Sequence, residues 1–164
     1  MRTAVIDSST LISLTHLGLA KHVSLYFDRV YVPRSVQREV NRKARFRYRL
    51  NRLYQAGVFM RCAAADQTSV WLLRAELDEG EAEALIQAAE KAARFFIGDE
   101  KRAREISEGM GLKPVGTLRI LARLSAEDLA PELGILVRKL QRDLGFRVSK
   151  EVIRQAIATE AEPI

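Results

Sequence analysis

Short runs of β-forming residues alternate with helical patterns along most of the chain, and this alternation constrains the fold more than any other feature. Apolar or β-branched runs occupy Thr3–Ile6, Arg29–Val32 and Phe95–Ile97. Apolar residues at helical spacing follow each of these runs. Strands that alternate with helices form a parallel sheet whose two faces the helices cover. We therefore expect an α/β fold with a short central parallel sheet.

Glycine, proline and apolar spacing set the ends of the other predicted elements. Gly18 and Gly145 end helices, and Pro33 ends a strand and suits the first turn of a helix. Two further strands are expected at Val58–Arg61, whose place in the sheet is open, and at Pro114–Val115. The predicted helices are Ser8–Leu17, Leu19–Tyr26, Asp78–Ala92, Lys101–Glu108, Thr117–Leu124, Pro131–Leu144 and Ser149–Ala158, together with one that starts at Arg34 and continues into a basic segment.

The length of the chain fits one domain. Its 164 residues, 48% of them apolar, are enough for one hydrophobic core and too few for two. We predict residues 1–150 as the main domain and residues 151–164 as a C-terminal helix and tail that pack on it or fray. The single cysteine, Cys62, has no Cys or His nearby in the sequence, which excludes a disulfide framework and a thiolate zinc site. The lack of a disulfide framework predicts a reducing, cytoplasmic setting. No membrane partner is expected, since no apolar run reaches the length of a membrane span.

Basic residues outnumber acidic ones, and arginine supplies most of them. The chain has 27 Lys plus Arg against 21 Asp plus Glu, a net charge of +6. Arginine binds phosphate through paired hydrogen bonds, so this balance favours a nucleic-acid partner. A basic surface without a dedicated ligand is the alternative.

A segment that combines cations with aromatic residues follows the helix predicted at Arg34. Single-stranded RNA suits such a segment, because cations bind phosphates and exposed rings stack on unpaired bases. A second interpretation is a solvated helix face whose rings, Phe46, Tyr48 and Tyr54, point into the core. Both interpretations stay open on the sequence. The cations are Arg42, Lys43, Arg45, Arg47, Arg49 and Arg52.

Acidic residues stand where the predicted parallel strands end. Asp7 follows the first strand directly, and Asp99 comes two residues after Phe95–Ile97. Ligands bind at this edge of an open parallel sheet. Glu39 lies on the helix after the second strand, and Glu81 lies in the first turn of the alanine-rich helix. Each acid also has an ordinary explanation as a helix cap, a dipole partner or a surface residue, so spacing alone does not decide its role.

Four carboxylates that meet at one edge of the sheet would repel one another, and a divalent cation is the natural way to neutralise them. With oxygen donors and no Cys or His ligand, such a site favours Mg²⁺ or Mn²⁺ over zinc. Two such ions about 3.5 to 4 Å apart activate a water and stabilise the leaving oxygen in phosphodiester cleavage. Convergence of the acids would therefore indicate metal-dependent hydrolysis.

Several short motifs occur in order along the chain. AVIDSSTLISL runs a strand into Asp, a hydroxyl pair and an apolar helix, and VPRSVQREV begins a helix with Pro and carries an acid near its end. LDEGEAEALIQAAE and FFIGDEKRAREISEGMGL carry a third and a fourth acid, and VGTLRIL holds a Gly-Thr turn. Together the motifs resemble the PIN-domain family, in the prokaryotic subgroup related to VapC-type toxin ribonucleases. The likeness covers most of residues 1–150.

This resemblance implies a PIN-like three-layer α/β/α fold and a metal-dependent endoribonuclease, the toxin of a toxin–antitoxin pair. It implies Mg²⁺ or Mn²⁺ as the cofactor and RNA and an acidic antitoxin as partners, and exposed helices suit a homodimer. A noncatalytic PIN-like RNA-binding or regulatory module is the alternative function. Carried over by residue, the catalytic and metal-binding acids are Asp7, Glu39, Glu81 and Asp99, with Ser9 and Thr117 as supporting hydroxyls and Glu83 as a competitor of Glu81.

Overall fold

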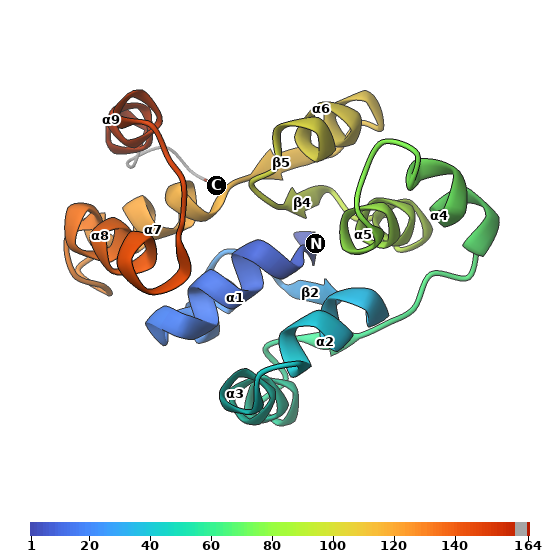
Figure 1. Cartoon of the computed structure of the whole chain (residues 1–164), viewed down its shortest axis with the longest axis horizontal. Coiled ribbons are helices and arrows are strands. Elements are labelled where there is room, and N and C mark those ends of the chain that lie inside the picture. The colour runs from blue at the N-terminus through green and yellow to red at the C-terminus, as the bar shows by residue number, and fades with distance from the viewer. Residues whose placement is uncertain (160–163) are drawn as a thin grey trace.

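A five-stranded parallel sheet forms the centre of the protein, whose computed structural model describes residues 1–159 and 164 (Figure 1). The strands lie in the order β3-β2-β1-β4-β5, so the first strand is the middle one. Ile6 of β1 pairs with Ile97 of β4, which brings together the residues that follow these two strands. The strands are β1 Thr3–Ile6, β2 Arg29–Val32, β3 Met60–Arg61, β4 Phe95–Ile97 and β5 Lys113–Val115.

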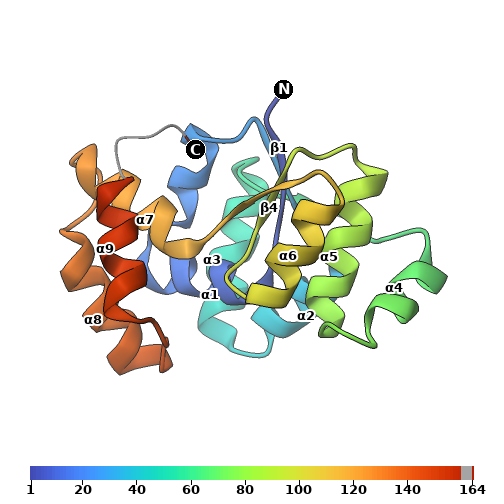
Figure 2. The same ribbon diagram turned by 90° about the horizontal axis from the view of Figure 1, so that it is seen from above.

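Helices cover both faces of the sheet and give the protein three layers (Figure 2). The first face carries α1, η1, α7 and α8, and α4, α5 and α6 contribute to the core of the second face. The helices are α1 Ser8–Leu17, η1 Ala20–Leu25, α2 Arg34–Asn41, α3 Ala44–Gln55, α4 Gln67–Leu73, α5 Glu79–Glu90, α6 Lys101–Gly109, α7 Thr117–Ala126, α8 Leu133–Leu144 and α9 Lys150–Ala158.

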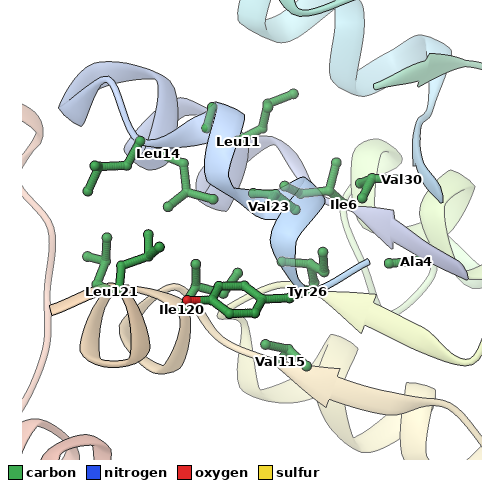
Figure 3. Close-up of a cluster of buried hydrophobic side chains, with 14 of the residues drawn as sticks. Ala4, Ile6, Leu11, Leu14, Val23, Tyr26, Val30, Val115, Ile120 and Leu121 are labelled. Atoms are coloured by element: carbon green, nitrogen blue, oxygen red, sulfur yellow. The ribbon is translucent and has the colours of Figure 1, made fainter. Parts of the chain in front are cut away.

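Two hydrophobic clusters, one on each face of the sheet, hold the layers together. Successive side chains of a strand point to opposite faces. Ala4 and Ile6 of β1 accordingly lie in the larger cluster, and Val5 lies in the smaller cluster with α5. Figure 3 shows Ile6 gathered with Leu14 of α1 and Ile120 of α7 in the larger cluster. The predicted three-layer α/β/α fold with a short parallel sheet is thus confirmed.

The helix predicted from Arg34 into the basic segment is broken in two. It ends at Asn41, and α3 begins at Ala44 after Lys43, whose backbone is extended at φ −103° and ψ 119°. The change of direction lets α3 place Phe46 in the same core cluster as α1. The cations of the segment remain on its outer side.

Two other stretches also differ from the sequence-based expectation. The segment predicted as an α-helix over Leu19–Tyr26 forms the 3-10 helix η1. Helix α4, which the sequence did not predict, begins after Asp66, whose carboxylate accepts the N–H of Ser69 at 3.0 Å. Helix α4 buries only Val70, so its apolar periodicity is weak.

The C-terminal helix α9 packs on the rest of the protein. Its Ala156 is buried in the larger cluster, near α7. Residues 160–163, part of the tail predicted to fray, lie outside the described residues. Among the residues that the structure describes, no helix has both the length and the apolar character needed to cross a membrane.

Candidate metal centre

Asp7 is fixed at the point where β1 passes into α1. Its N–H donates to the carbonyl of Ile97 at 2.9 Å, which continues the strand pairing by one residue. Its carboxylate caps α1 by accepting the N–H of Thr10 at 2.8 Å and also accepts the hydroxyl of Ser9 at 2.9 Å. Because Asp7 is only 2% exposed, these contacts fix the direction of a buried carboxylate.

A glycine directly after the neighbouring strand β4 makes room for this carboxylate. A Cβ at Gly98 would lie 2.9 Å from Oδ2 of Asp7 and 2.6 Å from the ring of Phe96. Real Cβ atoms do not approach that closely, so the chain that leaves β4 passes Asp7 with a residue that lacks a side chain. The next residue, Asp99, is thereby placed beside Asp7 at the carboxyl edge of the sheet.

Asp99 is held by the first residue of α7. Its Oδ1 accepts the N–H of Thr117 at 2.8 Å, and its Oδ2 accepts the hydroxyl of Thr117 at 2.5 Å. The same hydroxyl oxygen lies 3.1 Å from that of Thr10. Thr10 and Thr117 therefore join the two aspartates in one hydrogen-bonded network. Thr10 was not among the predicted site residues, and its only sequence signal is its position three residues after Asp7.

The charged forms of Asp7 and Asp99 are unfavourable in the folded protein, and the pKa of each is raised. Burial raises the pKa of Asp7 to about 7, the repulsion from Asp99 adds to the rise, and the hydrogen bonds from Thr10 and Ser9 oppose it. Burial also raises the pKa of Asp99, against the hydrogen bonds from Thr117 and the charge of Arg104. A cation between the two carboxylates would relieve both the burial and the repulsion.

Glu81 lies in the first turn of α5 and forms a capping box with Asp78. Asp78 accepts the N–H of Glu81 at 2.8 Å, and Glu81 accepts the N–H of Asp78 at 3.2 Å. Burial raises the pKa of Glu81, and the charges of Asp78, Glu100 and Glu39 add to the rise. Glu81 therefore lies within electrostatic range of the exposed Glu39 of α2 and of Glu100, which the sequence analysis did not single out although it follows Asp99.

Glu83 faces a different part of the protein from Glu81. Two residues along a helix are separated by about 200° around its axis. The carboxylate of Glu83 accepts the N–H of Ser35 at 2.7 Å, the hydroxyl of Ser35, and the N–H of Ala64 at 3.3 Å. These hydrogen bonds connect α5 to the first turn of α2, so the carboxylate of Glu83 has a structural role.

The four predicted acids thus fall into two groups, which together with Glu100 we call the acid edge. Asp7 and Asp99 are joined through Thr10 and Thr117, and the buried Glu81 forms a second group with the exposed Glu39 and Glu100. Within residues 1–159 and 164, no three side chains of His, Cys, Asp or Glu are gathered closely enough to hold a metal ion. Metal binding at the acid edge would require the two groups to move closer together.

Comparison with known families decides the class of the protein. A family model described as a PIN domain matches residues 3–162, nearly the whole chain. The chain belongs to the PIN-domain family. PIN domains are generally nucleases, and PIN nucleases typically use divalent metals. No curated protein matches the chain.

The PIN domain also carries the predicted basic surface, on α3 and the residues before it. All six predicted cations are exposed. Phe46 is 1% exposed and lies in the core, and Tyr54 is partly buried beneath the guanidinium of Arg61, 4.1 Å from the ring centre. Tyr48 is 66% exposed. Of the three aromatic residues, Tyr48 alone presents an open ring, so the rings of Phe46 and Tyr54 follow the core interpretation, and RNA binding by the segment stays a prediction.

Proposed function

We propose that this PIN domain is a metal-dependent endoribonuclease that hydrolyses phosphodiester bonds in RNA. The observation that carries the proposal is the pair of aspartates, Asp7 and Asp99, joined through Thr10 and Thr117 at the carboxyl edge of the sheet. Both aspartates have a raised pKa. Buried carboxylates kept side by side are unfavourable for stability alone and are typical of a site that binds a cation.

The donor chemistry of the acid edge fits a hard divalent ion. Asp7, Asp99, Glu81 and Glu39 offer carboxylate oxygens, which Mg²⁺ and Mn²⁺ prefer. Such an ion, when bound, supplies an activated water for attack on the phosphodiester and stabilises the leaving oxygen. Glu81 would join the aspartates by giving up its 3.2 Å hydrogen bond to the N–H of Asp78, which is the weaker half of the capping box.

The basic surface supports RNA as the substrate. Its six exposed cations suit the phosphates of a polyanion, and the exposed ring of Tyr48 suits a stacked base. A groove of about 430 Å³ that shares Tyr48, Arg49 and Arg52 with this surface, and is otherwise lined by Lys21 and mainly apolar residues, suits an acidic protein segment. We therefore propose that an acidic antitoxin covers this face, as in a cytoplasmic toxin–antitoxin pair. Purification with a small acidic protein encoded beside it would support this partner.

Cleavage of a labelled single-stranded RNA tests the enzymatic proposal. With Mg²⁺ or Mn²⁺ the unsubstituted protein should cleave, and EDTA should stop it. Asp99→Asn should lower the rate by about 100-fold or more, because it removes a metal-binding charge while keeping the shape.

The matched control is Asp128→Asn, an exposed acid with φ 57°, a conformation that Asn tolerates. This variant should cleave like the unsubstituted protein. Full activity of Asp99→Asn would contradict the proposal. RNA binding without cleavage by the unsubstituted protein would assign the noncatalytic module instead.

A further inference from the structure

A cleft opens beside Asp99, and Asp7 is not part of its lining. It has a volume of about 370 Å³, within the range of about 300 to 1,000 Å³ that is usual for small-molecule sites. One wall comes from the end of β5 and the start of α7, and the other comes from α9 and the residues before it. Asp99 lines this cleft, so the cleft is continuous with the acid edge.

Three arginines, Arg104, Arg119 and Arg147, give the cleft a positive charge. Arg104 of α6 lies close enough to Asp99 to lower the pKa of that carboxyl, and its Nη1 would lie 3.1 Å from a Cβ at Gly116. Arg147 is exposed and precedes α9, whose amino-terminal end adds a partial positive charge. Neither the Arg104 nor the Arg147 guanidinium forms an ion pair within 4 Å with an acid of the described residues. Both are therefore available to a phosphate.

The rest of the lining suits a nucleoside. Phe146, Val148 and Val152 contribute apolar surface, and Gln155 and Thr159 contribute polar groups. Apolar walls with a few polar groups and a cation at one end match a flat base attached to a phosphate. A purely ionic site for inorganic phosphate would not need the apolar walls.

We propose that this cleft binds the RNA nucleotide that adjoins the scissile phosphate on the Asp99 side. Arg104 and Arg147 hold its phosphate, and the wall that carries Phe146 and Val152 holds its base. The inference rests on the proposed ribonuclease activity and adds to it a subsite that positions the RNA strand. Arg147 is in this account a substrate-positioning residue, because it acts on the neighbouring nucleotide rather than on the reacting atoms.

The test compares Arg147→Gln with Arg154→Gln, which removes the same charge from the exposed face of α9 outside the cleft. Arg104 is left unchanged because its charge acts on Asp99. Binding of a labelled single-stranded RNA is measured in protein that also carries Asp7→Asn, so that the RNA is not cleaved. Arg147→Gln should weaken binding about 5- to 10-fold. The slope of the logarithm of the binding constant against the logarithm of the salt concentration should become shallower by the amount that about one phosphate contact contributes. Arg154→Gln should bind within about twofold of the parent.

Kinetics and an altered RNA complete the test. In protein with an intact Asp7, Arg147→Gln should raise KM with kcat within about twofold, as expected for lost uniform binding. The cleavage position is first mapped, and an abasic nucleotide is then placed on either side of it. An abasic nucleotide on one side should weaken RNA binding several-fold, and one on the other side should leave RNA binding unchanged.

The outcomes separate the two proposals. RNA cleavage by the unsubstituted protein, with equal binding by Arg147→Gln and Arg154→Gln, overturns the cleft and leaves the ribonuclease standing. Equal effects of the abasic nucleotide on both sides overturn the base-binding role of the walls. Failure of the unsubstituted protein to cleave RNA overturns the ribonuclease, and the cleft proposal with it.

Discussion

The acid edge and helix α3 hold their charges in opposite ways. Asp7 and Glu81 are 2% and 8% exposed, and burial raises the pKa of each. The cations on α3, such as Arg47, stand in water. A buried charge destabilises the folded state, whereas an exposed one costs almost nothing. The acids therefore oppose the stability of the fold, and the cations are nearly neutral to it.

Replacing Asp7 should have the largest effect on stability. Asp7→Asn keeps the acceptor for the N–H of Thr10 and removes the buried charge, so it should raise the free energy of unfolding by about 2 to 4 kcal/mol at pH 8 without metal. Arg47→Gln on α3 should change it by less than about 0.5 kcal/mol. Denaturant unfolding of both variants measures these changes. Equal changes in the free energy of unfolding would contradict the difference between the buried acid and the exposed cation.

The unsubstituted protein and Asp7→Asn should also differ in how the free energy of unfolding depends on pH. The folded protein keeps the proton on Asp7 up to about pH 7, whereas the unfolded chain releases it near the ordinary pKa of 3.8. Between these values the folded state binds more protons, so the free energy of unfolding falls as the pH rises from about 4 to about 7. Asp7→Asn should show a smaller fall, because only the raised pKa values of Asp99 and Glu81 then contribute to it. A fall of the same size in the variant and in the unsubstituted protein would contradict the contribution of Asp7.

A smaller effect should separate the two glutamates of α5. Glu83→Gln should lower the free energy of unfolding by about 1 to 3 kcal/mol, because an amide cannot accept all the hydrogen bonds from Ser35 and Ala64. Glu81→Gln should change stability by less than about 1 kcal/mol and should lower RNA cleavage much more. Thermal or denaturant unfolding and the cleavage assay give the two readouts. If Glu83→Gln instead lowered cleavage more than Glu81→Gln did, Glu83 would be the third acid of the site.

Local patterns in the sequence predicted the elements that form the acid edge. The ends of α1 at Ser8 and Leu17 follow from Asp7 as a cap and from Gly18, whose φ of 76° suits glycine. The predicted strand Phe95–Ile97 is β4 without change, because a short buried run has sharp polar borders. The PIN resemblance, which the family comparison confirms, supplied the acids as a set.

Long-range side-chain contacts could not be predicted in the same way. The hydroxyls of Thr10 and Thr117 meet across 107 residues of sequence, and no local rule relates their positions. The direction of Glu81 relative to Glu83 depends on how α5 sits against α2, which spacing does not specify. The cleft beside Asp99 depends on how α9 and the residues before it are placed opposite the end of β5 and the start of α7. Such features come from packing rather than from periodicity.

Calorimetric titration with Mn²⁺ tests most directly whether the acid edge binds a divalent cation. The unsubstituted protein should show saturable binding, Asp128→Asn should match it, and Asp99→Asn should weaken it by about 10-fold or more. Binding of equal strength in the unsubstituted protein and in Asp99→Asn would place the metal elsewhere and contradict the account.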